Sequence, residues 1–532
     1  MTEFPTPPAD YKQGKRNAFT RFLDGVEWLG NLLPHPVTLF ALLAVGIVLV
    51  SGLFGWMGVA VEDPRPAGAP NVAEDGMIRA VSLMNGDGVR RIFTGLVDNF
   101  TSFAPLGVVL VAMLGVGVAE KSGLLSAAVR SMVLGAPPKL VTVAIVFAGI
   151  ISNTASEVGY VVLIPLGGAI YYALGRHPLA GMAAAFAGVS GGYSANLLIG
   201  TIDPLLAGIT QEAAQLIDPD YTVLATANWY FMFASTFLVT IIGSLVSIYI
   251  VEPKLGPYDA AKADPDVLDE GMMQPLSDTE RKGLRWSGVA LLGVLAFMAL
   301  TLVPEWGVLR NAETGDRMDS PFFDGFVVWI LIFFITIGYT YGRVTGSMKT
   351  DRDVIDAMSE ALSALGLYIV LVFFAAQFVA FFGWTNLGAI TAVTGANFLV
   401  ESGMTGPVVF FAFILICAII NLSLGSASAQ WAVTAPIFVP MLMLIGYAPE
   451  AIQAAYRIGD STTNIITPMM SYFGLILAWA TRYQKDLGVG TLIAMMLPYT
   501  IFFITAWSVF FYLWTFVFGL PVGPGSPTYY AP

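Results

Sequence analysis

Apolar runs of about membrane length recur along the chain, separated by short polar segments. A helix needs about 20 mainly apolar residues to cross the hydrocarbon core of a bilayer. Nine segments meet this requirement and are predicted to span the membrane: 37–59, 103–119, 178–211, 226–250, 286–304, 323–342, 361–383, 451–481 and 487–518. The segments 178–211 and 451–481 carry glycines and small polar residues near their middle, which predicts interrupted helices. The pattern therefore predicts an all-α polytopic membrane protein with nine transmembrane helices.

Two further apolar stretches, 138–174 and 406–446, are too long for a single helix and also carry small polar residues near their middle. Basic residues indicate on which side of the membrane each stretch begins and ends, because cytoplasmic loops are enriched in Lys and Arg. Arg130 and Arg176 flank the first stretch, whereas the segments on both sides of the second contain neither Lys nor Arg. We therefore expect two re-entrant hairpins that enter from opposite faces of the membrane.

The same distribution of charge orients the whole chain and divides it into segments. Lys12, Lys15 and Arg16 place the N-terminus in the cytoplasm, and the count of crossings then places the C-terminus in the periplasm of a bacterial cell. The expected divisions are an N-terminal cytoplasmic segment (1–36), a first span with a periplasmic loop (37–102), a first repeat (103–250), a cytoplasmic linker (251–285), two connecting spans with their loops (286–360), a second repeat (361–518) and a periplasmic tail (519–532).

The two repeats have the same order of elements: helix, hairpin, broken helix, helix. The hairpin tips read Ser-Asn-Thr-Ala-Ser at 152–156 and Ser-Ala-Ser-Ala-Gln at 426–430, and the helix breaks follow at 191–196 and 459–464. Because the hairpins open in opposite directions, this is an inverted repeat, and interrupted segments at matching places mark the substrate site of such transporters. Non-helical backbone persists at membrane depth only where protein or a water-filled cavity surrounds it, so we expect the four breaks to meet.

Charged residues inside these segments are candidates for substrate binding and ion coupling. Arg457 and Asp460 lie on one helical face, either as a mutually satisfied structural pair or as a carboxylate-binding arginine with an aspartate that orients it or binds an ion. Asp203 has no basic residue nearby in sequence, and a buried carboxylate without a partner favours its neutral form, which suits proton transfer. Alternatively, Asp203 caps the helix that restarts at Pro204. Glu157 is a weaker candidate for proton transfer.

Uncharged polar residues and one tryptophan complete the predicted site. Amide and hydroxyl oxygens suit a monovalent cation or polar substrate groups, and the alternative for each residue is a hydrogen bond to the broken backbone. The ion-coupling candidates are Asn153, Thr154, Asn196 and Asn464, and the polar substrate-binding candidates are Asn421 and Ser428. Trp431 is predicted to form a wall for an aromatic or apolar part of the substrate. Pro449 and Pro468 are candidate hinges.

Composition supports the membrane assignment and excludes several kinds of protein. Hydrophobic residues make up 56% of the 532 positions and charged residues only 12%, about half the share that a soluble domain carries. Cys417 is the only cysteine and there are two histidines, so we expect no disulfide, no multi-histidine metal site and no cofactor beyond a coupling H⁺ or Na⁺. The net charge of −12 comes without basic stripes, so no nucleic-acid partner is expected.

The tips and breaks also carry a family resemblance. The sequences SNTASEVGYVVLIPL after Ile151, VSGGYSANLLIGTIDPLLAGIT after Gly188, SASAQWAVTAPIFVPM after Gly425 and YRIGDSTTNIITPMMSYFG after Ala455 resemble the p-aminobenzoyl-glutamate transporter (AbgT) family, particularly its MtrF-like efflux members. The resemblance covers nearly the whole chain and is weakest in the 252–285 linker. It implies a bowl-shaped homodimer whose protomers each have nine spans and two hairpins.

The resemblance further implies kinship with ion-coupled dicarboxylate carriers, whose Ser-Asn-Thr tips bind sodium and substrate. The first tip keeps that motif, whereas the second replaces it with Ser426-Ala427-Ser428. A full pair of sodium sites is therefore not expected, and the first tip is the place where Na⁺ could bind as the alternative to H⁺. Functional positions of the family match Asp203, Asn421, Ser428, Trp431, Pro449, Arg457, Asp460 and Pro468.

These expectations combine into a functional prediction with named alternatives. The family handles p-aminobenzoyl-glutamate, and some members export sulfonamide antimetabolites with the proton gradient, so the resemblance implies a secondary active transporter and not an enzyme. A sodium-coupled dicarboxylate importer and a passive channel are the alternatives. A membrane-embedded aspartyl protease built on Asp203 and Asp460 is disfavoured, because Arg457 would hold Asp460 ionised while a protease dyad shares a proton.

Overall fold

The computed structural model describes residues 34–65, 75–154, 159–259 and 275–530. Nearly all of the N-terminal segment 1–36, the middle of the 251–285 linker and residues 155–158 of the first tip, with Glu157, lie outside these ranges. Within them the chain is helical except for its connections and one antiparallel two-stranded sheet, in which β1 (Ala60–Glu62) pairs with β2 (Met77–Arg79).

The first part of the chain, which includes the first repeat, folds into short and long helices with three π-helical turns. Its elements are α2 (Pro36–Met57), α3 (Gly86–Thr101), α4 (Ala104–Lys121), α5 (Leu124–Leu134), α6 (Val141–Ser152), η1 (Gly159–Leu163), α7 (Ile164–Ala173), α8 (Pro178–Phe186), η2 (Ala187–Gly191), α9 (Ile202–Ala214), α10 (Trp229–Val246), η3 (Ser247–Val251) and α11 (Glu252–Leu255).

The second part continues with connecting helices and the second repeat. Its elements are α12 (Asp278–Leu302), α13 (Pro321–Asp324), α14 (Phe326–Thr345), α15 (Asp351–Ala364), α16 (Gly366–Trp384), α17 (Leu387–Glu401), α18 (Val409–Leu424), α19 (Ala427–Leu444), α20 (Pro449–Thr463), α21 (Phe473–Tyr483), α22 (Val489–Tyr512) and η6 (Leu513–Val517).

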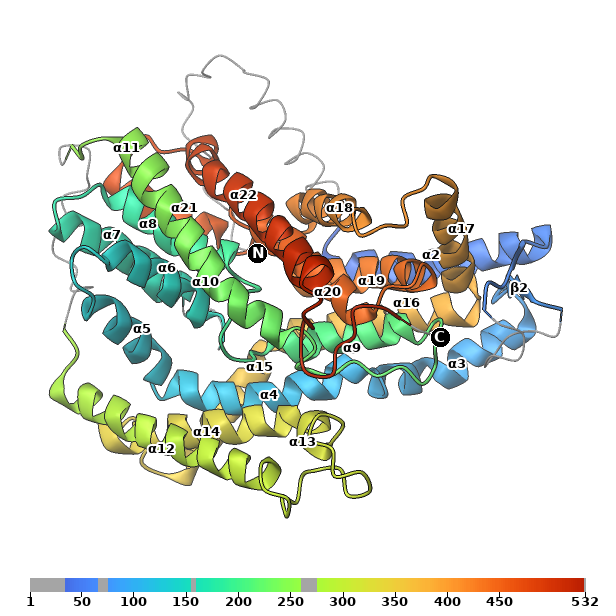
Figure 1. Cartoon of the computed structure of the whole chain (residues 1–532), viewed down its shortest axis with the longest axis horizontal. Helices are drawn as coiled ribbons and strands as arrows, with labels where there is room; N and C mark the ends of the chain where they lie inside the picture. The colour runs from blue at the N-terminus through green and yellow to red at the C-terminus, as the bar shows by residue number, and fades with distance from the viewer. Residues whose placement is uncertain (1–33, 66–74, 155–158, 260–274, 531–532) are drawn as a thin grey trace.

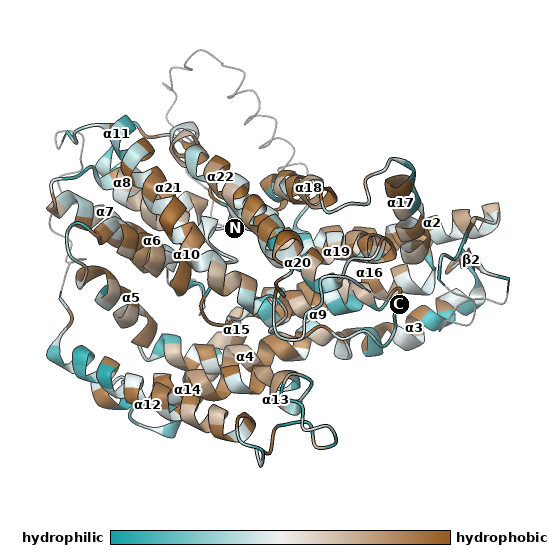
Figure 2. Ribbon diagram, viewed as in Figure 1, coloured by the Kyte–Doolittle hydropathy of each residue, from teal (hydrophilic) through white to brown (hydrophobic). Residues whose placement is uncertain are grey.

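Eight helices in the described part of the chain are long and apolar enough to cross a membrane, and Figure 2 shows hydrophobic residues along most of their length. This confirms the predicted all-α polytopic membrane fold. Seven of the eight coincide with the seven predicted uninterrupted spans, and the eighth is α19, the second arm of the predicted hairpin 406–446. Because α19 is long enough to be either an arm or a span, the count of nine spans and two hairpins stays a prediction.

The predicted interruptions are all present. The segment 178–211 divides into α8 with η2 and, after an irregular stretch, α9, and 451–481 divides into α20 and α21. At the predicted tips, α6 ends at Ser152 and helix resumes at Gly159, while α18 and α19 are separated by Gly425 and Ser426. Gly425 has a φ of 56°, a left-handed conformation that glycine adopts without steric cost, and this allows the sharp reversal.

Four helices of more than ten residues lie in segments that were predicted to be loops: α3, α5, α15 and α17. The helix α15 has a recognisable start, because Thr350 and Asp353 form a capping box. The start of α3 is stabilised by Asn85, whose side chain accepts a hydrogen bond from Gly88 N at 2.7 Å. A search for runs of membrane length overlooks helices of 11 to 16 residues such as these.

Pairs of packed helices bring the two repeats together at the centre of the molecule (Figure 1). The helix α4 lies between α14 and α9, and α12 covers the far side of α14. In the centre, α19 and α20 of the second repeat pack against α9 of the first, and α22 packs against α10. Contacts between the repeats therefore involve the broken helices, a hairpin arm and the unbroken pair α10 and α22.

Glycines allow α4 and α14 to approach closely. A Cβ placed on Gly338 of α14 would lie 2.6 Å from the Cα of Ala119, and one placed on Gly115 of α4 would lie 2.8 Å from the carbonyl oxygen of Leu331. Small residues at such crossings promote helix association in membranes, where the hydrophobic effect between helices is absent. This contact anchors α12 and α14 to the rest of the fold.

We predict that Gly338→Ala destabilises the protein by about 1–3 kcal/mol, because the added methyl group forces α4 and α14 apart. Gly293→Ala on α12 is the matched control, since a Cβ there meets no atom within 4 Å and alanine favours helix. Thermal unfolding in detergent should show a lower midpoint for the first variant and an unchanged or higher one for the second. Equal midpoints would show that α4 and α14 can move apart at this crossing without loss of stability.

Candidate functional site

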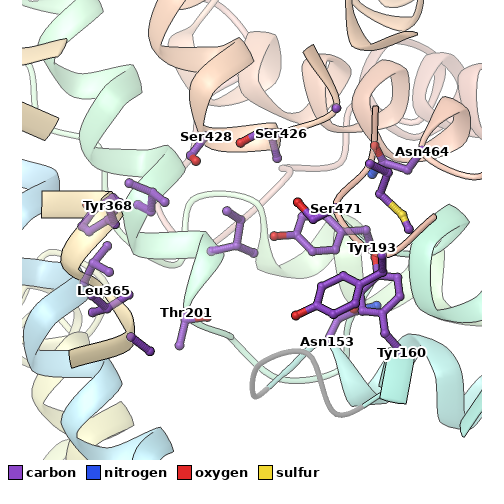
Figure 3. Close-up of a pocket in the computed structure, with 18 of the residues that line it drawn as sticks. Asn153, Tyr160, Tyr193, Thr201, Leu365, Tyr368, Ser426, Ser428, Asn464 and Ser471 are labelled. Carbon is purple, nitrogen blue, oxygen red and sulfur yellow. The ribbon is translucent and has the colours of Figure 1, made fainter. Parts of the chain in front are cut away.

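A cavity of about 410 Å³ lies where elements of the two repeats meet (Figure 3). The first repeat contributes the end of α6, η1, the break after η2 and the start of α9. The second repeat contributes the start of α19 and the connection from α20 to α21, and the α15–α16 junction closes one side. The cavity therefore forms at the meeting of tips and breaks that the inverted repeat predicts.

The polar groups of the cavity wall are uncharged. Three predicted site residues line it: Asn153, Ser428 and Asn464. Hydroxyl groups that the sequence analysis did not select also line it, on Thr201, Ser426 and Ser471. No Asp, Glu, Lys or Arg is among the described lining residues. The wall can offer hydrogen bonds to a polar or anionic molecule, but it offers no side-chain counter-charge in this conformation.

Tyrosines form the aromatic part of the wall. The rings of Tyr160 and Tyr472 stack with their centroids 4.6 Å apart and their planes within 8°, and Tyr193 and Tyr368 also line the cavity. Because Tyr160 belongs to η1 and Tyr472 precedes α21, the stack joins the two repeats. None of these tyrosines was among the predicted site residues, although an aromatic residue close to a break was the signal that selected Trp431.

The first tip is held by side-chain hydrogen bonds to its own broken backbone. The amide of Asn153 donates to the carbonyl of Val189 at 2.8 Å, and the hydroxyl of Ser152 donates to the carbonyl of Gly149 at 2.6 Å. The hydroxyl of Thr154 donates to Asn196 Oδ1 at 2.8 Å, which links the tip to the first break. The bonds from Ser152 and Asn153 satisfy backbone carbonyls, which is the alternative role considered for these polar residues. The ion-coupling role of Asn153, Thr154 and Asn196 stays a prediction.

Asn421 ties the second hairpin to the second break. Its Nδ2 donates to the carbonyl of Asp460 at 2.7 Å, to Thr463 Oγ1 at 3.0 Å and to Asn464 Oδ1 at 2.8 Å. Asn421 is fully buried in α18, and its Oδ1 has no hydrogen-bond partner in the described part of the chain. The residue therefore fixes the end of α20, where Asn464 reaches the cavity wall.

A buried ion pair joins the two repeats beside the cavity. Arg457 Nη2 on α20 donates to Asp203 Oδ1 on α9 at 2.6 Å, and both side chains are at most 4% exposed. The other oxygen of Asp203 accepts a hydrogen bond from the backbone N–H of Gly200 at 2.6 Å. An isolated charge at this depth is costly, so each residue stabilises the charged form of the other.

This pair corrects two readings of the sequence. Asp203 is not an unpaired carboxylate, and Arg457 is not bonded to Asp460 as a mutually satisfied pair. Neither carboxylate oxygen of Asp460 has a hydrogen-bond partner among the residues that the structure describes, because the nearby hydroxyl of Tyr456 donates to the carbonyl of Ala427 instead. The partners Asp203 and Arg457 are 254 positions apart, so spacing along one helix could not identify them.

The remaining predicted residues lie away from the cavity. Trp431 is fully buried, stacks on Tyr456 with centroids 4.2 Å apart and donates from Nε1 to Thr210 Oγ1 at 2.8 Å, so it forms no part of the wall in this conformation. Pro449 is the first residue of α20, and Pro468 lies in the non-helical stretch before α21. Their roles as hinges stay predictions.

The described residues contain no group of three or more His, Cys, Asp and Glu side chains placed to hold a metal ion. The features that define the site are instead a mid-fold cavity built from interrupted helices and a buried ion pair that crosses between repeats. Irregular backbone gathered around a central cavity in a polytopic fold is typical of secondary transporters. The fold and site thus define a multi-pass membrane transport protein.

Comparison with known proteins gives the family. The AbgT putative transporter family matches residues 21–530. The p-aminobenzoyl-glutamate transport protein of Escherichia coli (strain K12) is 36% identical over 500 residues, which cover 94% of this chain and 95% of that protein. The chain therefore belongs to the AbgT transporter family, as the resemblance predicted.

Two solved structures are similar over nearly their full length. MtrF of Neisseria gonorrhoeae, described as illuminating a class of antimetabolite efflux pumps, is 60% identical with a TM-score of 0.90, covering 95% of this chain and 100% of that chain. The YdaH transporter of Alcanivorax borkumensis is 45% identical with a TM-score of 0.84, covering 92% of this chain and 100% of that one. These matches confirm that the chain is a transporter and not an enzyme.

We predict that the buried pair is energetically coupled. Arg457→Leu or Asp203→Leu alone should destabilise the protein by about 3–5 kcal/mol, because each leaves an uncompensated buried charge, and the double variant should lose less than the sum. Denaturant unfolding in micelles gives the coupling from a double-mutant cycle. The exposed pair Asp75–Arg79 is the control, where about 0–1 kcal/mol is expected. Additive losses at Arg457 and Asp203 would contradict direct pairing.

Proposed function

We propose that this protein is a secondary active transporter that exports aromatic, anionic molecules of the p-aminobenzoyl-glutamate type, including sulfonamide antimetabolites, with energy from the proton gradient. The observation that carries the proposal is a cavity lined by both repeats, which combines stacked tyrosines with uncharged hydrogen-bonding groups. Its volume falls within the range of about 300–1,000 Å³ that is typical of sites for small organic ligands. The names of the Escherichia coli and Neisseria relatives support this choice of substrate.

The cavity suits an aryl ring joined to carboxylates. The faces around Tyr160 and Tyr472 suit the ring, since aromatic pairs prefer stacked or edge-on arrangements. The helices α9 and α19 both begin at the cavity, and neither of their N-cap residues, Thr201 and Ser426, caps its own helix with its side chain. The first N–H groups of a helix bind anions, so these two helix ends would bind the carboxylates.

The ion pair gives the proposed coupling its chemistry. In the proposed cycle, the bond between deprotonated Asp203 and Arg457 holds α9 against α20 and keeps the substrate site assembled. A proton that arrives on Asp203 breaks this bond and releases the substrate, and loss of the proton restores the site, so proton and substrate move in opposite directions. Asp460, whose carboxylate oxygens are not hydrogen-bonded to any described residue, is the further proposed site for the coupling ion or for orienting Arg457.

The proposal extends to assembly and placement in the cell. We propose a homodimer in the bacterial inner membrane, with the N-terminus in the cytoplasm and the C-terminus in the periplasm. In this arrangement 138–174 and 406–446 are re-entrant hairpins that open to opposite sides, and Pro449 and Pro468 are hinges of the second repeat. A Na⁺ ion at Asn153 and Thr154 is the alternative coupling ion.

We predict that Asp203→Asn and Arg457→Ala each lower transport at least tenfold while the protein still inserts and dimerises. The measurement is flux of labelled p-aminobenzoyl-glutamate and of a sulfonamide in proteoliposomes, with pH and sodium gradients imposed separately. Wild-type flux should saturate and follow the pH gradient. The controls Asp75→Asn and Arg79→Ala alter an exposed ion pair and should keep wild-type rates.

Three outcomes would contradict this proposal in different ways. Wild-type rates from both Asp203→Asn and Arg457→Ala would reject the coupling site. Flux that follows the sodium gradient alone would reject the proton and favour the first tip as the ion site. Flux that rises linearly with concentration, without saturation or coupling, would indicate a channel.

We predict that Tyr472→Ala raises the half-saturating concentration of p-aminobenzoyl-glutamate by about twofold to tenfold, because an aromatic contact is worth about 0.5–1.5 kcal/mol. Tyr472→Phe keeps the ring and should match wild type. Tyr249→Ala, on an exposed face of η3, serves as the surface control. Equal affinities in the Tyr472→Ala and Tyr472→Phe variants would place the aryl ring elsewhere.

A further inference from the structure

A second cavity, of about 300 Å³, lies directly behind the first tip. One wall is the tip itself, through Ile151, Ser152 and Thr154, and the opposite walls belong to α5, α12 and α14. The first tip thus lies between two cavities. Its residue Asn153 lines the polar cavity described above. The other residues that line this second cavity are almost entirely aliphatic or aromatic, including Leu291 of α12.

The few hydroxyl groups in this wall are already engaged within the protein. Ser152 and Thr154 donate to Gly149 O and Asn196 Oδ1 as described, and Ser287 of α12 donates to the carbonyl of Ile337 at 3.0 Å. Water in a buried site needs two to four polar partners, whereas apolar cavities of about 150 Å³ stay dry and take up apolar molecules. The chemistry of this wall therefore selects a hydrocarbon occupant.

The surroundings of the cavity supply such an occupant. The outer face of α12 exposes Val289, Leu292 and Leu295, which is the face that a membrane-spanning helix turns to lipid. Gly288 lines the cavity on the adjacent face, and a Cβ placed there would meet no atom within 4 Å. An acyl chain that leaves the bilayer beside α12 therefore meets open space at this position.

Basic residues outnumber acidic ones at one end of the same helix, where Asp278 and Glu280 also lie and Glu280 is paired with Arg130. Arg281, Lys282 and Arg285 lie in the first two turns of α12 and are exposed, and Leu284, which lines the cavity, lies between them. Basic side chains next to a membrane segment attract anionic lipid headgroups. These basic residues would attract a phospholipid with a negative headgroup but not an uncharged hydrocarbon.

We propose that this cavity binds one acyl chain of an anionic phospholipid, with the lipid phosphate at the basic first turns of α12. The chain fills the space behind the first tip and supplies the packing contacts that an empty cavity lacks. Since the tip also lines the polar cavity, the lipid acts as a support for the transport site from behind. The proposal concerns binding at α12 and does not depend on which substrate is carried.

The test uses the full-length protein in phosphatidylethanolamine vesicles with a trace of phosphatidylglycerol that carries a diazirine on its acyl chain. After irradiation, mass spectrometry locates the labelled residues. We expect saturable labelling of Leu284 and Leu291, which face the cavity, and non-saturable labelling of the lipid-facing Leu292 and Leu295. Gly288→Leu fills the cavity and should reduce the saturable labelling at least tenfold.

The control Gly293→Leu adds the same side chain to the lipid-facing side of α12, where space is also open, and should keep wild-type labelling. Ala128→Leu, which fills the cavity from α5, gives a second variant if Gly288→Leu does not insert. Undiminished labelling in both cavity-filling variants would overturn the site. Equal labelling from a phosphatidylcholine probe would overturn the choice of an anionic lipid.

Discussion

Backbone groups that leave a helix at membrane depth must find hydrogen bonds inside the protein, because lipid offers none. In the described part of this chain, side-chain amides and hydroxyls supply several of these hydrogen bonds next to the breaks. Asn153 donates to the backbone of the first break, Asn421 to the end of α20, and Thr467 donates to the carbonyl of Leu422 at 2.7 Å. Each of these bonds joins an arm of a predicted hairpin to a broken helix. The site residues are therefore held by the same bonds that make the irregular backbone possible.

The ion pair between Arg457 and Asp203 meets the same requirement for charged groups, because each charge finds its partner inside the protein. Two buried charges in contact are tolerable, whereas either one alone would be expensive. A fold that depends on this pair is sensitive to anything that neutralises one partner. A proton or a substrate carboxylate would change the balance of charge at this pair, which joins α9 of one repeat to α20 of the other. This sensitivity is a physical reason to seek coupling at the pair and not in the uncharged cavity wall.

The sequence was informative where a local pattern determines structure and uninformative where distant segments meet. Glycine and small polar residues inside apolar runs located all four breaks, because such residues weaken a helix in hydrocarbon wherever they occur. Arg457 and Asp460 share one helix, so their spacing indicated a pair, yet Arg457 bonds to Asp203 on another helix. Trp431 was assigned to the cavity wall, but it is packed between Tyr456 and Thr210. The stacked tyrosines 160 and 472 come from different repeats, and no local pattern brings them together.

The first tip shows how two environments can be kept apart by a few residues. Asn153 lines the polar cavity, while Ile151, Ser152 and Thr154 line the apolar cavity. The hydroxyls of Ser152 and Thr154 are bonded within the protein, so the tip presents an apolar back without leaving polar groups unsatisfied. The two cavities therefore lie on opposite sides of one tip, and a few residues keep polar and apolar surroundings apart.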